Sequence, residues 1–118
     1  MSLIWLHHVT SFGMGDGEMK IYISGKITGD AHYKEKFSAA ADEMEQVGHI
    51  ALNPANNPDG LRPVDYMRIC FAMMEAADAV MFLPDYKESK GAMLEYAWCE
   101  YVGKPTIFAE WEEKPNDT

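Results

Sequence analysis

A hydroxyl, a glycine and a carboxylate lie close together in the segment from Ser89 to Glu95. An apolar run at residues 79–83 and a Pro84-Asp85 turn precede it, so a buried strand is expected to lead through a loop into a helix. In an open α/β sheet, ligands bind where strands end and helices begin. A hydroxyl and a glycine amide at a helix start suit an anion, and Glu95 is within reach of the same crevice.

Glu95 itself lies among apolar residues, in the stretch from Ala92 to Trp98. A carboxylate in such a helix segment is costly to bury unless it is paired or used. The residues alone leave two interpretations open, a solvated glutamate on the helix surface or a nucleophile or acid/base group. The sequence offers no second carboxylate at an evident partner spacing and no Ser-His-Asp arrangement.

A second glycine loop, Ser24-Gly25 followed by Lys26, comes directly after another apolar run. If the two strands are neighbours, both loops meet at the topological switch point, where backbone N–H groups can cradle a phosphate. Lys26 and Lys90 would add positive charge. The spacing matches neither the P-loop nor the G-x-G-x-x-G fingerprint, and turns use glycine anyway, so these loops alone are weak evidence.

The elements that must position these residues alternate between strand and helix. Strands are expected at residues 20–25, 49–54, 79–83 and 104–109, and helices at residues 32–47, 63–77 and 89–102. Right-handed crossovers then give a parallel four-stranded sheet of order 2-1-3-4 with helices on both faces, a flavodoxin-like three-layer α/β sandwich. The first helix is expected to bury Val47 with its apolar face, and Met67, Met73 and Met74 are expected in the core.

The length of 118 residues predicts one domain, placed at residues 19–109. Residues 1–18 form an N-terminal extension with a flexible link at residues 13–17, and residues 110–118 form an acidic tail. The extension is either sequence upstream of a start at Met19 or a segment that docks on a partner through its apolar residues. The adjacent His7 and His8 lack a third ligand, so they are not expected to bind metal.

Composition narrows the function classes. The net charge of −9 and the pI of about 4.7 disfavour a general nucleic-acid binder, whereas a single nucleotide site needs only a few local donors. Cys70 and Cys99 show no C-x-x-C or metal spacing and are expected to be reduced thiols in a cytoplasmic protein. No run approaches the roughly 18 consecutive apolar residues of a membrane span. No metal or organic cofactor is expected.

In combination, four segments resemble the nucleoside 2-deoxyribosyltransferase-like superfamily, and most closely its small branch that is frequent in phages and prophages. The motif from Ser89 to Glu95 (a Ser or Asp, then Gly, then Glu six residues after the first) is moderately specific, and the combination is more so. Similarity extends to the 2′-deoxynucleoside 5′-phosphate N-hydrolases. The likeness covers about residues 19–108 and rests on residues 21–29, 48–54, 65–68 and 89–97.

The resemblance implies a mechanism. Glu95 would attack C1′ of a deoxynucleoside or its 5′-phosphate, and the covalent deoxyribosyl-enzyme would pass the sugar to another base or to water. Tyr22 would orient this glutamate. The substrate would be surrounded by residues at the positions of Gly25, Lys26, Ile27, Asn53, Cys70, Ser89 and Gly91.

Three positions bear on the substrate and on turnover. In the superfamily, nucleoside transferases carry Asp at the position of Ser89. Hydrolases of deoxynucleoside 5′-monophosphates carry Ser there, in contact with the phosphate. Because a serine does not repel a phosphate as a carboxylate does, Ser89 favours a nucleotide as the ligand. The same hydrolases carry Arg where this chain has Thr28. Active members usually carry Asp where this chain has Cys70, and a thiol cannot replace that charge at neutral pH unless its pKa is strongly lowered.

The sequence therefore predicts an N-glycosidic bond hydrolase or deoxyribosyltransferase for 2′-deoxynucleoside 5′-monophosphates, with hydrolysis favoured over transfer. The alternative, which Cys70 favours, is a nucleotide-binding module without turnover. A third and weaker hypothesis is a structural partner protein that uses the apolar N-terminal segment. The resemblance also implies a homodimer or larger homo-oligomer. Neither a nucleic acid nor a membrane is expected as a partner.

Overall fold

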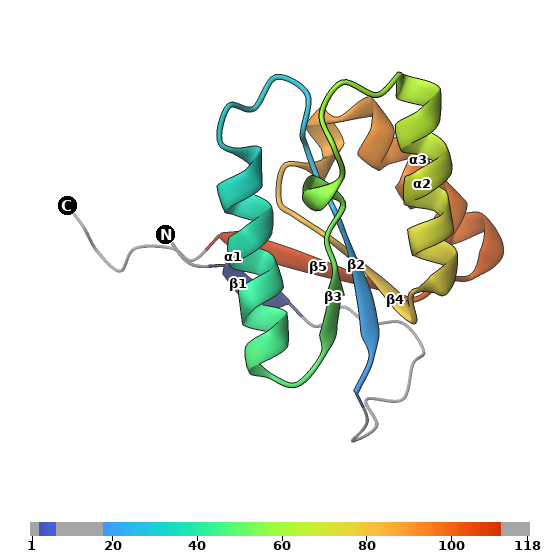
Figure 1. Ribbon diagram of the computed structural model, residues 1–118. Coiled ribbons are helices and arrows are strands. Elements are labelled where there is room, and N and C mark those ends of the chain that lie inside the picture. Colours follow the sequence, from blue (N-terminus) through green and yellow to red (C-terminus); the bar gives the residue numbers. More distant parts are fainter. Residues whose placement is uncertain (1–2, 7–17, 112–118) are drawn as a thin grey trace.

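The computed structural model describes residues 3–6 and 18–111. Five strands form one sheet in the order β1-β5-β4-β2-β3 (Figure 1). β2 (Lys20–Ser24), β3 (Ile50–Leu52), β4 (Ala79–Phe82) and β5 (Thr106–Trp111) run parallel, while β1 (Leu3–Leu6) pairs antiparallel with β5. In the part of the chain that the structure describes, no helix is both long and apolar enough to span a bilayer.

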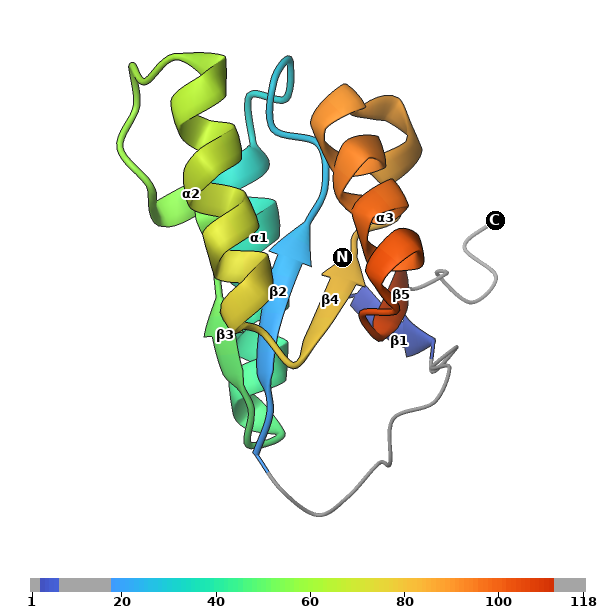
Figure 2. The same cartoon turned by 90° about the vertical axis from the view of Figure 1, so that its right-hand side faces the viewer.

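The predicted parallel sheet of order 2-1-3-4 is confirmed, because β3, β2, β4 and β5 follow one another in the sheet. Three helices connect them, α1 (Tyr33–Gln46), α2 (Pro63–Ala76) and α3 (Lys90–Val102), with short 3₁₀ turns η1 (Pro54–Asn56) and η2 (Tyr86–Glu88). Helix α1 covers one face of the sheet, and α2 and α3 cover the other (Figures 1 and 2). This is the expected three-layer α/β sandwich.

Strand β1 was not predicted. Its pairing runs from Leu3 opposite Trp111 to Leu6 opposite Phe108, so part of the N-terminal extension belongs to the sheet. Correspondingly, β5 continues to Trp111, two residues into the segment expected to be a tail. The predicted flexible link at residues 13–17, the two histidines at positions 7 and 8, and the tail from residue 112 onward lie outside the described residues.

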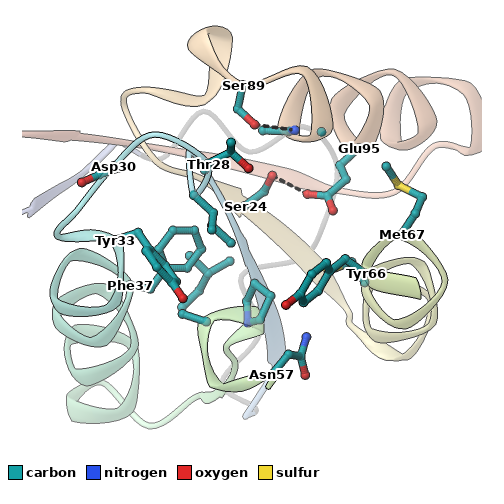
Figure 3. Close-up of a pocket in the computed structure, with 18 of the residues that line it drawn as sticks. Ser24, Thr28, Asp30, Tyr33, Phe37, Asn57, Tyr66, Met67, Ser89 and Glu95 are labelled. Atoms are coloured by element: carbon teal, nitrogen blue, oxygen red, sulfur yellow. Dashed lines mark hydrogen bonds between the residues drawn. The ribbon is translucent and has the colours of Figure 1, made fainter. Parts of the chain in front are cut away.

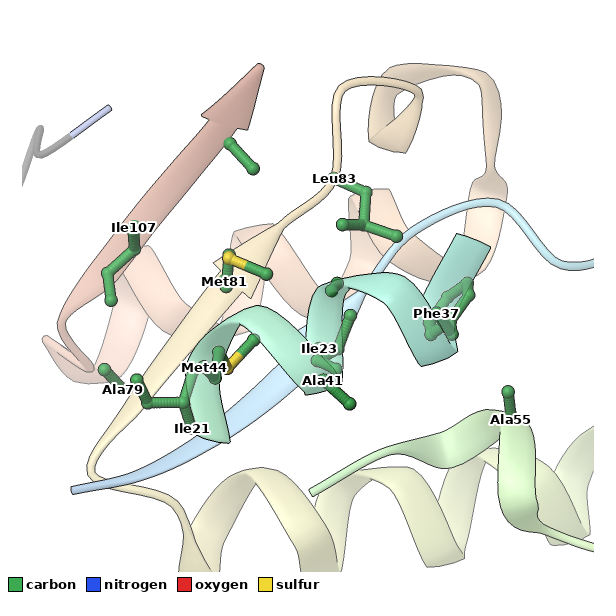
Figure 4. Packing of buried hydrophobic residues seen from close by; sticks show 12 residues of the cluster. Ile21, Ile23, Phe37, Ala41, Met44, Ala55, Ala79, Met81, Leu83 and Ile107 are labelled. Atoms are coloured by element: carbon green, nitrogen blue, oxygen red, sulfur yellow. The ribbon is translucent and has the colours of Figure 1, made fainter. Parts of the chain in front are cut away.

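Alternation along β2 divides the core in two. Ile21 and Ile23 point toward α1, where Figure 4 shows them packed with Phe37 and Met44. Tyr22 points to the opposite face, into the cluster under α2 and α3. The expectation that Val47 is buried is wrong, because α1 ends at Gln46 and Val47 lies past the last turn with 64% of its surface exposed.

The start of α3 is fixed by its N-cap, Ser89, whose Oγ accepts a hydrogen bond from the backbone N–H of Ala92 at 3.1 Å. Its end is fixed by Gly103, which adopts a left-handed conformation with φ of 79°. Between these ends, Ala92, Glu95 and Cys99 face inward at spacings of three and four residues. Glu95 therefore lies on the buried side of α3, on the same face as Ala92 and Cys99.

Candidate active site

A pocket of about 940 Å³ opens at the carboxyl end of β2, among the first turns of α2 and α3 and the loop that leads into α1. Figure 3 shows Ser24 and Glu95 on one side of it, Tyr33 and Phe37 of α1 on another, and Tyr66 of α2 on a third. This is the switch point of the doubly wound sheet, where ligands are expected to bind.

The Glu95 carboxylate lies in the wall of this pocket with only 7% of the residue exposed. The Tyr22 hydroxyl donates to Oε2 at 2.9 Å. The Ser24 hydroxyl donates to Oε1 at 2.6 Å, as the dashed line between them in Figure 3 shows. Each carboxylate oxygen therefore has its own donor. The interpretation of Glu95 as a solvated surface glutamate is wrong.

Two opposing effects act on the pKa of Glu95. Burial raises the pKa because it disfavours the charged form, while the hydrogen bonds from Ser24 and then Tyr22 act in the opposite direction. Burial prevails, so the pKa of Glu95 lies above its ordinary value. Burial and the nearby Glu95 charge also raise the pKa of Tyr22 well above its usual range, so Tyr22 stays protonated and remains a donor.

Cys70 borders the pocket from α2 and faces the Tyr22 hydroxyl. Burial and then the Glu95 charge raise the pKa of the Cys70 thiol, and together they outweigh the influence of the Tyr22 hydroxyl, which lowers it. The thiol is consequently neutral at neutral pH. It does not supply the negative charge that an aspartate would supply at this position.

The part of the pocket at the start of α3 is suited to an anion. Ser89, Lys90 and Gly91 begin α3 and all line the pocket. The first amides of a helix and its dipole favour negative charge, and the Ser89 hydroxyl proton remains available for donation while its oxygen caps the helix. Thr28 also lines the pocket and adds a hydroxyl.

The first loop is held against the end of β4 by close packing. A Cβ on Gly25 would approach Leu83 to 2.9 Å, so only glycine fits there. The partly buried Lys36 ammonium donates hydrogen bonds to the carbonyl of Lys26 at 2.9 Å and to the carboxylates of Asp30 and Asp85. This cluster fixes the loop whose residues Gly25 to Ala31, apart from Lys26, line the pocket.

Most of the residues implicated by the sequence are brought together, but two are not. Lys26 does not line the pocket, because its ammonium turns to Glu88 at 3.5 Å. Asn53 does not line it either, because its side chain caps η1 by accepting from the N–H of Ala55. The pocket wall includes the other candidates, Tyr22, Gly25, Ile27, Cys70, Ser89, Gly91 and Glu95.

Several lining residues were missed by the sequence. Ser24 could have been found, because strand alternation puts it on the same face as Tyr22. Tyr66, whose hydroxyl donates to the Pro58 carbonyl at 2.6 Å, forms a fixed aromatic wall that its sequence position does not reveal. Met67 lines the pocket rather than the core, which corrects the expectation for it, whereas Met74 is fully buried as expected.

Comparison with known proteins gives one match. The family model described as "Domain of unknown function (DUF4406)" matches residues 19–108. The chain belongs to this family. The matched span runs from just before β2 into β5, so the DUF4406 domain contains every residue that lines the pocket. No curated protein and no solved structure matches the chain significantly. Among the described residues, no group of three or more His, Cys, Asp or Glu side chains is placed to hold a metal ion.

The raised pKa of Glu95 predicts that Glu95→Gln stabilises this DUF4406 domain at neutral pH. Since ionisation is less favourable in the folded state, the wild type keeps its full stability below the ordinary pKa of 4.5 and loses some as pH rises through the folded pKa. The variant escapes this loss. We expect the variant to unfold at a higher temperature than the wild type at pH 8, and the difference to shrink toward pH 4, measured by thermal unfolding across this range. Glu75→Gln, on the exposed side of α2, is the control, and an equal gain at both pH values would contradict the assignment.

Proposed function

We propose that this DUF4406 protein cleaves the N-glycosidic bond of 2′-deoxynucleoside 5′-monophosphates, with Glu95 as the nucleophile. The observation that carries the proposal is a carboxylate, buried in a pocket wall, whose two oxygens each accept a hydroxyl hydrogen bond. Such a carboxylate is oriented before any ligand binds, as a covalent mechanism requires. The resemblance of residues 19–108 to the deoxyribosyltransferase-like superfamily supplies the substrate class.

The chemistry divides into two displacements. A Glu95 oxygen forms a bond to C1′ as the bond from C1′ to the base nitrogen breaks, and the base departs with the electron pair. Water then attacks C1′, giving deoxyribose 5-phosphate and restoring the Glu95 carboxylate. Of the two protons of this water, one stays on the sugar hydroxyl and the other balances the proton taken up by the base. Neither of these two reaction steps needs a cofactor.

The shape of the pocket supports this orientation of the substrate. With C1′ at Glu95, the 5′-phosphate would lie at the start of α3, near Ser89 and Gly91. The base would then occupy the part of the pocket walled by Tyr66 and Asn57, which Figure 3 shows away from Ser89. An aromatic wall and a carboxamide suit stacking and hydrogen bonding to a heterocycle.

A second candidate function is a nucleotide-binding module without turnover. The neutral thiol of Cys70 favours it, because active members of the superfamily that the sequence resembles usually carry an aspartate at this position. The same pocket would then hold the nucleotide, and Glu95 would contribute to binding only. Both candidate functions go with a proposed cytoplasmic location, because Cys70 and Cys99 are free thiols, which a reducing compartment maintains.

Incubation of the protein with each deoxynucleoside 5′-monophosphate should release free base, and chromatography measures the amount of base released. We expect Glu95→Gln to lose at least about a thousandfold of this activity, because the amide is a far weaker nucleophile. Native mass spectrometry during turnover should detect the added deoxyribosyl phosphate on the wild type alone.

Three outcomes separate the candidates. Base release that survives Glu95→Gln would remove Glu95 from the nucleophile role. Saturable nucleotide binding without base release would favour the binding module. In that case Cys70→Asp tests the reason directly, since a gain of base release in this variant would attribute the missing turnover to the thiol.

Substrate choice is expected to change with Ser89→Asp. Aspartate caps a helix as well as serine does, so α3 should keep its start and the fold its stability. The added negative charge would repel the 5′-phosphate, and we expect at least tenfold weaker binding of the nucleotide with little change for the nucleoside. Calorimetric titration with the two ligands measures both. Equal weakening for nucleotide and nucleoside would argue against phosphate at this end of the pocket.

We also propose that the protein forms a homodimer or larger homo-oligomer through the outer side of α3. Leu94 and Tyr101 on that helix are 55% and 91% exposed, and Leu94 also lines the pocket. Tyr101→Glu should reduce the molar mass measured by light scattering without changing the tertiary circular dichroism spectrum, because the side chain has few contacts in the monomer. A wild type that is monomeric at high concentration would exclude this assembly.

A further inference from the structure

We propose that Ser24 is a positioning residue for Glu95, because its hydroxyl fixes Oε1 and so holds the carboxylate in one orientation toward the pocket. This inference rests on the proposed role of Glu95 as nucleophile, and it gives Ser24 a role that its place in the predicted glycine loop did not suggest. Ser24 itself acts through Glu95 and is not required to touch the reacting atoms.

The first support is the rigidity of Ser24. It is the last residue of β2, lies in register with Phe82 of β4, and is only 1% exposed. Its carbonyl accepts a hydrogen bond from the N–H of Leu83 at 2.8 Å. Its backbone therefore cannot shift without disrupting the central pair of strands, and the hydroxyl projects from a fixed point.

The second support is how the two donors share the carboxylate. Ser24 reaches Oε1 at 2.6 Å, in the range of a hydrogen bond to an ionised acceptor, while Tyr22 reaches Oε2 at 2.9 Å. One donor would leave the carboxylate free to rotate about its last side-chain bond. Two donors, one on each oxygen, remove this rotation. An oriented nucleophile lowers the barrier because less freedom is lost when the reaction begins.

The third support is the charge environment. The titratable groups that face Glu95 are Tyr22 from β2, Cys70 from α2 and Cys99 from the next turn of α3. All three are neutral at pH 7, and burial raises the pKa of Cys99 to about 12. Nothing among these groups carries a compensating positive charge, so the hydrogen bonds alone favour ionised Glu95. Ser24 contributes more than Tyr22 to lowering the pKa of Glu95.

The experiment compares Ser24→Ala and Ser24→Cys with the wild type, and uses Ser38→Ala, an exposed serine of α1, as the matched control. Carboxyl carbon-13 NMR of the labelled protein follows the titration of Glu95, assigned by its absence in Glu95→Gln. We expect the midpoint to rise in Ser24→Ala, to lie between the two in Ser24→Cys, whose thiol is a weaker donor, and to stay unchanged in Ser38→Ala.

Kinetics supply the second readout. We expect kcat for base release to fall about tenfold to a hundredfold in Ser24→Ala, with a smaller change in KM and an acid limb displaced to higher pH. Ser24→Cys should recover part of this loss, and its similar volume guards against a packing defect as the cause.

The outcomes are distinguishable. An unchanged Glu95 midpoint in Ser24→Ala would overturn the proposal, whatever the kinetics. A loss of base release as complete as that of Glu95→Gln, with an unchanged acid limb, would also overturn it and assign Ser24 a direct role in the reaction. Absence of turnover in the wild type would refute the proposed function alone, because the NMR titration needs no activity and a raised midpoint would still support the Ser24 contact.

Discussion

The structure depends on the burial of one carboxylate. Glu95 on α3 is joined to Tyr22 and Ser24 on β2 across separations of 73 and 71 residues in the chain. A buried charge without partners would cost several kcal/mol, so these two bonds are a condition for α3 to pack on the sheet with Glu95 inward. Because burial still prevails over them, the site retains a destabilised charge, as is common where function requires it.

Contacts from several elements of the fold keep Tyr22, Ser24 and Glu95 close to one another. The sheet order puts β2 beside β4, so the strand that carries the donors adjoins the strand that leads into α3. The Ser89 cap fixes the start of α3, and Glu95 lies on the buried face of this helix together with Ala92 and Cys99. Gly25 lets the chain leave β2 close to Leu83, and the Lys36 cluster holds the loop that follows. These contacts come from different elements and converge on one pocket.

Much of this was predictable because it depends on local patterns. Periodicity gave every parallel strand and all three helices, and an apolar helix segment with one carboxylate singled out Glu95. What the sequence missed depends on pairings between distant segments. Strand β1 exists through its partner β5, and the ammonium of Lys26 turns away from the pocket because Glu88 is nearby in space. Alternation along β2 places Ser24 on the same face as Tyr22, but its contact with Glu95 follows only once α3 is known to pack on that face.

Cys70 is best understood from the same constraint. An aspartate at this position would bring a second carboxylate close to the Tyr22 hydroxyl and to Glu95. Like charges raise each other's pKa, so such a pair would share a proton and could divide the roles of acid and nucleophile. With a neutral thiol at position 70, the repulsion between two carboxylates is absent. Tyr22 and Ser24 then donate their hydrogen bonds to Glu95 alone. Compared with an aspartate at this position, the neutral thiol offers less capacity for proton transfer but avoids repulsion of an ionised Glu95, so the hydroxyls of Tyr22 and Ser24 are the groups that stabilise its charge.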